Sequence, residues 1–563
     1  MSKIKSLILK ISFLAAIFCL AVFVWYSPII FKGYPSAIPG ANQIIARNLV
    51  LSGKFSQENS KNIILNPALI FKEGMISSTG DKLIALASAL VYKIAGLPDQ
   101  ARAVFYSVII SALALLFFSL TVWRIFGFRL AVIFSVIYIF LPVIWETAVQ
   151  PNLYEYSLLF LSIGFFFFLV KWSKFEWLRF CLAGLFFALS FLARDAVALL
   201  APVIFIWLLF YNRRAIIPLF LSLVLPLLFF NIGFQSYFGK TGNYHLTYFR
   251  AAEVGGQVND FSFFSHLYPD PYTYHYGKED FLSEKENDLK KGGLNAVDIS
   301  KRLSNVEAKR ISLFEHFRVA PVLVAKHLSS IISLESVGGP LIFLLFILGM
   351  TNLIQSGRKH LAYLSMGWIS FVFIFCSFFA LAQRNHVMDF AFIFAMGVAL
   401  GIDQLVILVK EKMHIKYYIS IFFIVSLAAY QLILGAHVLF GRIYDDSSFL
   451  KLKAYQLAIN NIKISPEEVI AAPVNSGEIY GLNYLTDKSV VLFTNKTIEK
   501  LIKENKLQFA FKEFGITKII GYSPELTNQI IKQTKVVNIE IDKTSSVIPS
   551  DSSIKSLFMN LVR

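Results

Sequence analysis

The chain has 563 residues, of which 56% are hydrophobic and only 16% are charged. Soluble globular domains carry roughly 25% charged residues, so this composition excludes a soluble protein and indicates a polytopic membrane protein. The formal net charge of +17 comes from Lys and Arg spread through short turns between apolar runs. It therefore indicates membrane topology and excludes a nucleic-acid partner.

The first apolar run, residues 6–28, follows Lys3 and Lys5. No small-residue cleavage site comes after it, so we expect a membrane anchor whose carboxyl end faces out. Residues 29–100 then form an external loop. The last part of this loop, DKLIALASALVYKIAG, has helical periodicity but is too short to span, so we expect it to lie along the outer interface.

Further apolar runs fall at about 101–122, 129–145, 154–170, 178–193, 196–211, 215–235, 339–356, 361–381, 386–409 and 416–440. With the anchor they predict about eleven transmembrane helices. The turns WRIFGFR, KWSKFEWLR, YNRR, SGRKH and VKEKMHIK are basic, which places them in the cytoplasm. The polar segment 236–336 faces out by parity and is long enough to be a functional loop.

From Gly441 the composition changes to that of a soluble domain. SPEEVIAAP, KSVVLF and ITKIIGY are strand-like, and KTIEKLIKENKLQFAFKEFG has helical periodicity. The sequence therefore predicts a transmembrane domain over 1–440 and an external α/β domain over 441–563. No Walker-type or GxGxxG loop occurs, which argues against a nucleotide-driven transporter.

Acids at the predicted outer ends of the helices are candidates for catalysis. Glu155 opens the helix after PNLY, where an acid is either a general base or a cap that suits the positive end of the helix dipole. Glu58 and Asp81 are acids of the first external loop, and each also fits an ordinary exposed loop charge. We take Glu155, Glu58 and Asp81 as candidate catalytic residues.

Charged and imidazole groups at two outer tips are candidates for substrate binding. Arg194 and Asp195 stand between two apolar runs, and Arg384 and His386 stand in QRNH between two later ones. The planar guanidinium fork suits a phosphate group. The alternatives are a local Arg194–Asp195 ion pair and a snorkelling anchor at Arg384. We expect Glu155, Arg194 and Arg384 to line one outward-facing cavity.

Several segments, taken in order, resemble the GT-C superfamily of membrane glycosyltransferases, which includes the protein O-mannosyltransferases and the bacterial aminoarabinose transferases. They are IIARNLVLSGKFS, the helix ending KIAG, the acid in NLYEYSLLF, the hairpin GLFFALSFLARDAVALLAP, the segment QRNHVMDFAF and the terminal α/β domain. These segments follow one another in the order typical of the family, and together they extend over nearly all of the chain.

The resemblance implies inverting transfer of a sugar from a polyprenyl-phosphate donor to an extracytoplasmic acceptor. It places a carboxylate as base and Arg194 and Arg384 on the donor phosphate, and Glu155 matches the second acidic position of the family. It implies no nucleotide-sugar pocket and no obligatory metal or other cofactor, which fits a chain without a zinc-ligand pattern.

The acid that the family carries in the first external loop has no counterpart here, because no Asp or Glu occurs from Tyr34 to Leu49. Either the base comes from Glu155, Glu58 or Asp81, or the reaction is lost or changed. A non-catalytic binder of lipid-linked sugars, a transporter or flippase for such lipids, and a ligase of lipid-linked glycans remain alternatives.

Overall fold

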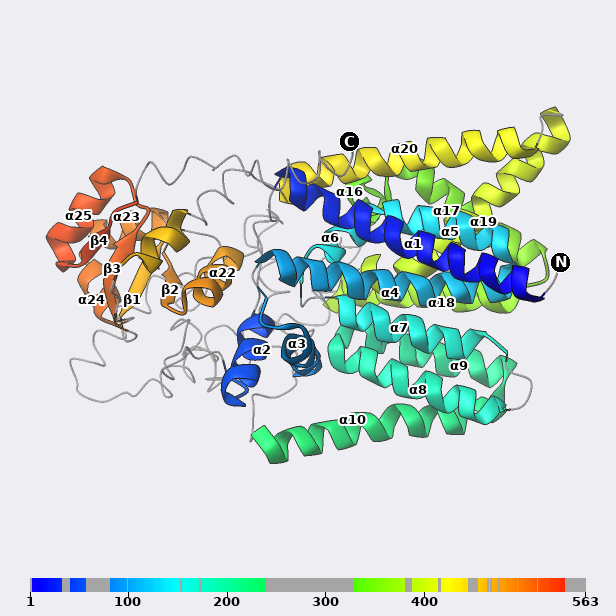
Figure 1. The fold of residues 1–563 in the computed structure, drawn as a ribbon, viewed down its shortest axis with the longest axis horizontal. Helices are drawn as coiled ribbons and strands as arrows, with labels where there is room; N and C mark the ends of the chain where they lie inside the picture. The colour runs from blue at the N-terminus through cyan, green and yellow to red at the C-terminus, as the bar shows by residue number, and fades with distance from the viewer. Residues whose placement is uncertain are drawn as a thin grey trace.

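A computed structural model describes the chain except for several segments. These are residues 1–2, 33–40, 57–81, 99, 152–153, 172–174, 239–327, 330, 380–386, 414–416, 444–453, 463–464, 466–467, 474–475, 494, 514 and 542–563. The described part consists of a bundle of apolar helices and an α/β module beyond one end of it (Figure 1).

The bundle helices follow the apolar runs of the sequence. They are α1 (Lys3–Lys32), α4 (Gln100–Phe126), α5 (Phe128–Phe140), α6 (Pro142–Ala148), α7 (Glu155–Leu169), α8 (Glu176–Ala193), α9 (Leu200–Tyr211), α10 (Ile216–Phe238), α16 (Leu334–Val337), α17 (Pro340–Gln355), α18 (Lys359–Phe379), α19 (Val387–Met413) and α20 (Tyr417–Ile443). The 3₁₀ turns Asp195–Leu199 and Arg213–Ala215 precede α9 and α10.

Five of the described helices are long and apolar enough to cross a membrane, or six if the bent pair α5 and α6 counts as one span. Shorter apolar helices accompany them at Glu155–Leu169, Val197–Tyr211, Pro340–Gln355 and Ile424–Val438. The fold is therefore that of a polytopic helical membrane protein. A helix occupies each range expected from the sequence, while the count of eleven spans stays a prediction.

The apolar run 129–145, expected as a span, forms two helices, α5 and α6, which pass for a span only as a pair and meet at an angle of 65°. Leu141 between them is extended, with φ −66° and ψ 119°. The ring of Pro142 disfavours a helical conformation at the residue before it, so the chain leaves α5 at Leu141 and starts again at Pro142. This break turns the WETA segment of α6 by 65° away from the axis of α5.

The helix α19 lies at the centre of the bundle, and small residues let α17 approach it closely. A Cβ added at Gly349 of α17 would collide with the carbonyl of Gly397, and one at Gly401 would collide with the carbonyl of Leu345. Close backbone approach at small residues is typical of helix pairs within membranes. On another face of α19, Phe392 stacks on Phe118 of α4 with ring centroids 4.3 Å apart.

The basic turns gather at the end of the bundle remote from the α/β module (Figure 1). Arg358, between α17 and α18, donates a hydrogen bond to the carbonyl of Ile125 near the end of α4 (3.3 Å). Trp207 of α9 donates one to the carbonyl of His360 (2.7 Å), and Lys171 after α7 lies close enough to act electrostatically on His360. The turns assigned to one side from charge alone thus meet in space.

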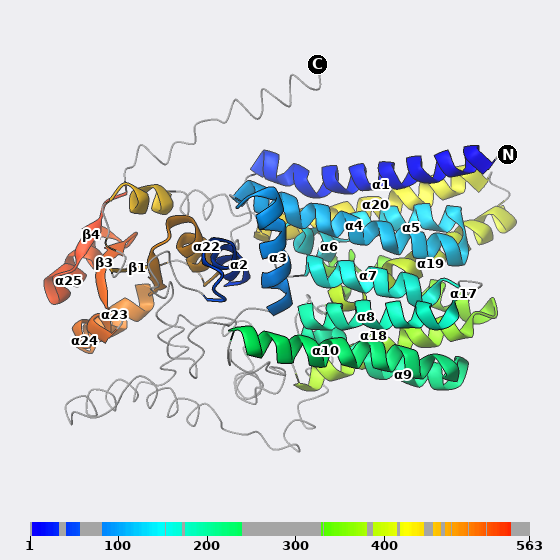
Figure 2. The same cartoon turned by 60° about the horizontal axis from the view of Figure 1, so that its bottom comes forward.

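The loop that the sequence predicts to be external contains two helices in its described part, α2 (Ala41–Ser52) and α3 (Lys82–Ala95). The sequence did not lead us to expect α2. The second helix, α3, runs across the direction of the bundle helices at the end that faces the module (Figure 2). This orientation agrees with the interfacial position expected for it.

The α/β module contains a four-stranded parallel sheet in the order β2-β1-β3-β4. Its elements are β1 (Val469–Ala472), α22 (Ser476–Thr486), β2 (Ser489–Leu492), α23 (Asn495–Lys503), α24 (Leu507–Glu513), β3 (Ile516–Ile520), α25 (Pro524–Thr534) and β4 (Val537–Ile539). The single helix expected after β2 is two helices, because Asn505 adopts a positive φ of 56° between them.

Arg47 joins the module to the first loop. Its two Nη atoms donate to the carbonyl of Tyr484 (2.9 Å) and to the carboxylate of Asp487 (3.0 Å). The Tyr484 hydroxyl in turn donates to the carbonyl of Pro98 (2.8 Å), just before α4. The module is thereby tied to the same end of the bundle as α2 and α3.

Candidate functional site

Arg194 forms a buried ion pair with Asp389. Its Nε lies 2.6 Å from Oδ1 and its Nη2 lies 3.4 Å from Oδ2 of the aspartate. Arg194 caps the carboxyl end of α8 in an extended conformation, so its side chain leaves the helix and reaches α19. Asp389 sits in the first turn of α19, where a negative charge suits the helix dipole.

Tyr154 and Glu146 complete this cluster. The guanidinium carbon of Arg194 lies 4.1 Å from the centre of the Tyr154 ring, and Glu146 is close enough to act electrostatically on Tyr154. The residues next to Glu146 and Asp389 also touch, because the Thr147 hydroxyl contacts the Met388 sulfur at 3.4 Å. The break at Pro142 therefore brings α6 beside the start of α19.

Glu155 begins α7, as the sequence predicts, and its side chain is buried. Its Oε2 accepts a hydrogen bond from the backbone amide of Tyr154 (3.1 Å). The acid thus supports the start of its helix, which is the structural role considered for it. Glu155 also directly follows Tyr154, and the Arg194 guanidinium lies over the ring of Tyr154.

An apolar cluster brings four elements together at this end of the bundle. Ile84 of α3, Ile110 of α4, Tyr156 of α7 and Ala193 of α8 pack against one another. Each of three ionisable residues lies within two positions of a member of this cluster: Lys82, Glu155 and Arg194. Two charges predicted to share a region, those of Glu155 and Arg194, therefore lie at the same end of the bundle.

The charged groups of this end are almost removed from solvent. The exposed fractions are 5% for Glu146, 1% for Glu155, 2% for Asp389 and 4% for Lys82, and 15% for the Arg194 side chain. Charges at such depth are costly unless they are paired, and within membrane domains they commonly mark substrate paths. Lys82 also lies 4.8 Å from the centre of the Phe234 ring of α10.

Several predicted site residues lie outside the described part of the chain, namely Glu58, Asp81, Arg384 and His386. Asp195 is in the 3₁₀ turn before α9, but its side chain is not described. The local Arg194–Asp195 ion pair, the alternative considered from the sequence, therefore stays untested, while the structure pairs Arg194 with the carboxylate of Asp389.

Sequence reasoning missed Asp389 and Lys82, whereas it did expect Glu146 at the same end of the bundle as Glu155 and Arg194. A carboxylate three residues into an otherwise apolar helix was the available signal for Asp389, since such a charge needs a partner. Among the residues that the structure describes, no group of three His, Cys, Asp or Glu side chains could hold a metal ion.

No protein-family model matches the chain, and no curated protein matches it. Among solved structures, the chain is similar to ArnT from Cupriavidus metallidurans bound to undecaprenyl phosphate, with 13% identity, a TM-score of 0.37, and coverage of 94% of this chain and 90% of that one. ArnT from the same organism in the apo state gives 13% identity, a TM-score of 0.34, and coverage of 94% and 89%. Likeness of this degree leaves the family of the chain open.

Proposed function

We propose that the protein is a GT-C-like membrane glycosyltransferase that moves a sugar from a polyprenyl-phosphate donor to an extracytoplasmic acceptor with inversion. In this proposal the end of the bundle that carries Arg194, α3 and the α/β module faces out, because the basic turns lie at the other end. Eleven helices cross the membrane, and the acceptor is a lipid, a glycan or a protein.

The ion pair between Arg194 and Asp389 is the observation that carries the proposal. The carboxylate holds one edge of the guanidinium in place, so the group does not have to be ordered when a ligand arrives. A fixed cation at this depth suits the phosphate that departs from the lipid-linked sugar, because its charge grows as the glycosidic bond breaks. Lys82 supplies a second buried cation at the same end.

Glu155 is the first candidate for the base. In the proposed reaction a carboxylate removes a proton from a hydroxyl or amine of the acceptor, which attacks the anomeric carbon while the bond to the lipid phosphate breaks. Glu146 is the second candidate, because it lies close enough to Tyr154 to act on it electrostatically, and the Tyr154 ring contacts the Arg194 guanidinium. Glu58 and Asp81 remain candidates from the sequence alone.

A non-catalytic binder of lipid-linked sugars is the second candidate function. One observation favours it: the segment 34–49, where the family carries its first acid, contains no Asp or Glu, and α2, which overlaps this segment, contains none either (ANQIIARNLVLS). A binder would need the cations that hold the phosphate but not a base.

The purified full chain in liposomes, given a panel of radiolabelled polyprenyl-phosphate sugars with and without membrane acceptors, separates these functions. A transferase moves label out of the donor fraction, and Arg194→Met and Glu155→Gln each lower the rate by about 10²-fold or more. Lys93→Gln, at an exposed basic residue of α3, is the matched control and keeps the full rate.

Each other outcome has a definite meaning. Unchanged turnover in Glu155→Gln transfers the role of base to another acid, with Glu146→Gln as the next variant. Saturable donor binding that is lost in Arg194→Met, without any consumption, establishes the binder. Neither binding nor consumption of any donor contradicts both functions.

A further inference from the structure

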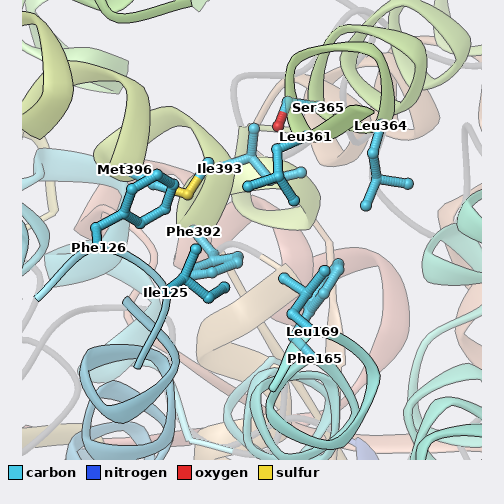
Figure 3. A pocket seen from close by; sticks show the side chains of 10 residues that line it. All are labelled: Ile125, Phe126, Phe165, Leu169, Leu361, Leu364, Ser365, Phe392, Ile393 and Met396. Atoms are coloured by element: carbon cyan, nitrogen blue, oxygen red, sulfur yellow. The ribbon is translucent and has the colours of Figure 1, made fainter. Parts of the chain in front are cut away.

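The charged groups near Arg194 are carried by two kinds of element. Glu155, Arg194 and Asp389 belong to α7, α8 and α19, which are packed helices of the bundle. Figure 3 shows part of this packing, where side chains of α4, α7, α18 and α19 meet around a space that would hold about one water molecule. Lys82 belongs instead to α3, which crosses the end of the bundle. Its position therefore depends on what holds α3.

The helix α2 supports the part of α3 that carries Lys82. It lies between α3 and α22 of the α/β module and contacts both (Figure 2). Ile45 of α2 and Ala85 of α3 share an apolar cluster with Phe234 of α10, and the Lys82 ammonium lies 4.8 Å from the centre of the same Phe234 ring. A movement of α2 would therefore reach the surroundings of Lys82 directly.

Arg47 fixes α2 to the module with all three guanidinium nitrogens. One Nη donates to the carbonyl of Tyr484 (2.9 Å) and the other to the carboxylate of Asp487 (3.0 Å), while Nε donates to Oδ1 of Asn48 at 3.4 Å. The Arg47 side chain is 10% exposed, so water competes little for these bonds. The planar fork of Arg makes such directed bonds at once, which the single ammonium of Lys does not.

The module presents the partners of Arg47 on one turn. Asp487, between α22 and β2, has a φ of 53°, a left-handed conformation that Asp tolerates better than most residues. Tyr484, three positions earlier, packs against Ile44 of α2, and its hydroxyl donates to the carbonyl of Pro98 (2.8 Å), shortly after the end of α3. The module thus contacts the chain both before and after α3.

We propose that the α/β module holds α3 in place through α2, and that Arg47 thereby positions Lys82 for transfer. With the Arg47 contacts made, α2 stays packed against α3 and the Lys82 ammonium has a fixed location. Arg47 itself faces the module and contacts no substrate, so it is a positioning residue. The role of Lys82 in transfer rests on the proposed function, whereas the support of α3 by the module does not.

Hydrogen exchange of the purified full chain in detergent tests the support of α3 without any donor. We expect Arg47→Gln to raise the exchange of α2 and α3 at least tenfold, because two bonds from a charged donor are lost, and to leave that of α7 unchanged. Asp487→Asn, which suits the same positive φ, should raise exchange in the same helices by less. Arg214→Gln, at an exposed arginine of the basic end, is the matched control. Unchanged exchange of α3 in Arg47→Gln, or an equal rise in α7, overturns the proposal.

Turnover of a labelled polyprenyl-phosphate sugar in liposomes tests the positioning of Lys82. Arg47→Gln and Lys82→Gln should each lower kcat about tenfold and change the KM for donor less than about threefold, because Arg194 still contacts the phosphate. The double variant should be no slower than Lys82→Gln alone, since Arg47 acts through Lys82, and Arg47→Lys should restore only part of the rate. Losses that multiply in the double variant contradict the proposal. If the unaltered protein transfers no sugar, the proposed function fails, and hydrogen exchange still decides whether the module supports α3.

Discussion

Arg194 and Asp389 are 195 positions apart in the sequence, yet two nitrogens of the guanidinium face the two carboxylate oxygens of the aspartate. The pair joins the end of α8 to the first turn of α19, the central helix of the bundle. The Asp389 side chain is 1% exposed and the Arg194 side chain 15% exposed, so each charge would be poorly solvated if the other were removed. The same ion pair therefore stabilises this end of the bundle and holds in place the cation that we propose for function.

Removing one partner of this pair should destabilise the fold more than removing both. Asp389→Leu should lower the free energy of unfolding by about 3–5 kcal/mol, because it leaves a buried cation without its partner. The double variant Arg194→Met with Asp389→Leu should recover much of that loss and still fail to bind donor. A double-mutant cycle from unfolding in mixed micelles measures the coupling. Strict additivity of the two single changes would show that the pair contributes nothing.

Arg179 should stabilise the turn between α7 and α8. One of its Nη atoms donates to the carbonyls of Phe168 and Val170, both at 3.1 Å, so it pairs carbonyls that the end of α7 leaves without helical partners. We expect Arg179→Met to cost roughly 1.5–3 kcal/mol, the value of hydrogen bonds from a charged donor. Arg214→Met, at an exposed arginine of the same end, should cost less than about 0.5 kcal/mol. Equal thermal unfolding midpoints for the two variants would refute this role.

Much of the bundle was predictable because apolar runs and basic turns are local signals. The helices lie in the expected ranges, and α3 crosses the end of the bundle as its short apolar run suggested. The hydropathy of 129–145 predicts a span but does not report the bend, which only the proline at position 142 signals. The first helix of the loop, α2, was not predicted, because the segment that precedes it is rich in Gly and Pro, which are typical of turns.

The site was less predictable because its contacts join distant parts of the chain. Asp195 stands next to Arg194 in the sequence and was the local partner considered for it, while Asp389 is brought to Arg194 by the packing of α19 against the rest of the bundle. Likewise Glu146 reaches the cluster only because of the 65° bend that precedes it. No local pattern reports which of several buried acids meets a given arginine.

Two glycines offer a matched test of helix packing. Gly349→Ala should destabilise the bundle by about 1–3 kcal/mol, because its Cβ would meet the carbonyl of Gly397 and force α17 away from α19. Gly233→Ala in α10 has nothing within 4 Å of the added atom and should gain up to about 1 kcal/mol from the better helix propensity of Ala. Unfolding of the two variants under one condition gives the comparison, and the same sign for both would contradict it.

The α/β module should lose an ion pair in acid. Burial tends to raise the pKa of Glu468, but the hydrogen bonds from Lys518 and from the Ser465 amide, with the charges of Lys518 and Lys488, outweigh it and hold the pKa below its ordinary value of 4.5. A lowered pKa in the folded state gives stability that is present above pH 4.5 and is lost as the pH falls through the folded pKa. Hydrogen exchange of β1 and β3 should therefore rise below pH 4.5 in the unaltered protein, and Glu468→Gln should already show the higher exchange at pH 7. Identical pH profiles for the two proteins would show that the ion pair between Glu468 and Lys518 does not stabilise the module.

The proposed function requires that the Arg194 cluster and the α/β module face away from the side that carries the basic turns. The test uses two variants, Lys171→Cys and Lys532→Cys, each made in a chain whose Cys19, Cys181 and Cys376 are replaced. Labelling of each single cysteine by a membrane-impermeant maleimide shows on which side of the membrane that position lies. We predict that intact cells label position 532 and that position 171 reacts only after the membrane is opened. Labelling of both positions from the same side would contradict the topology and, with it, the assignment of the site to a lipid-linked sugar outside the cytoplasm.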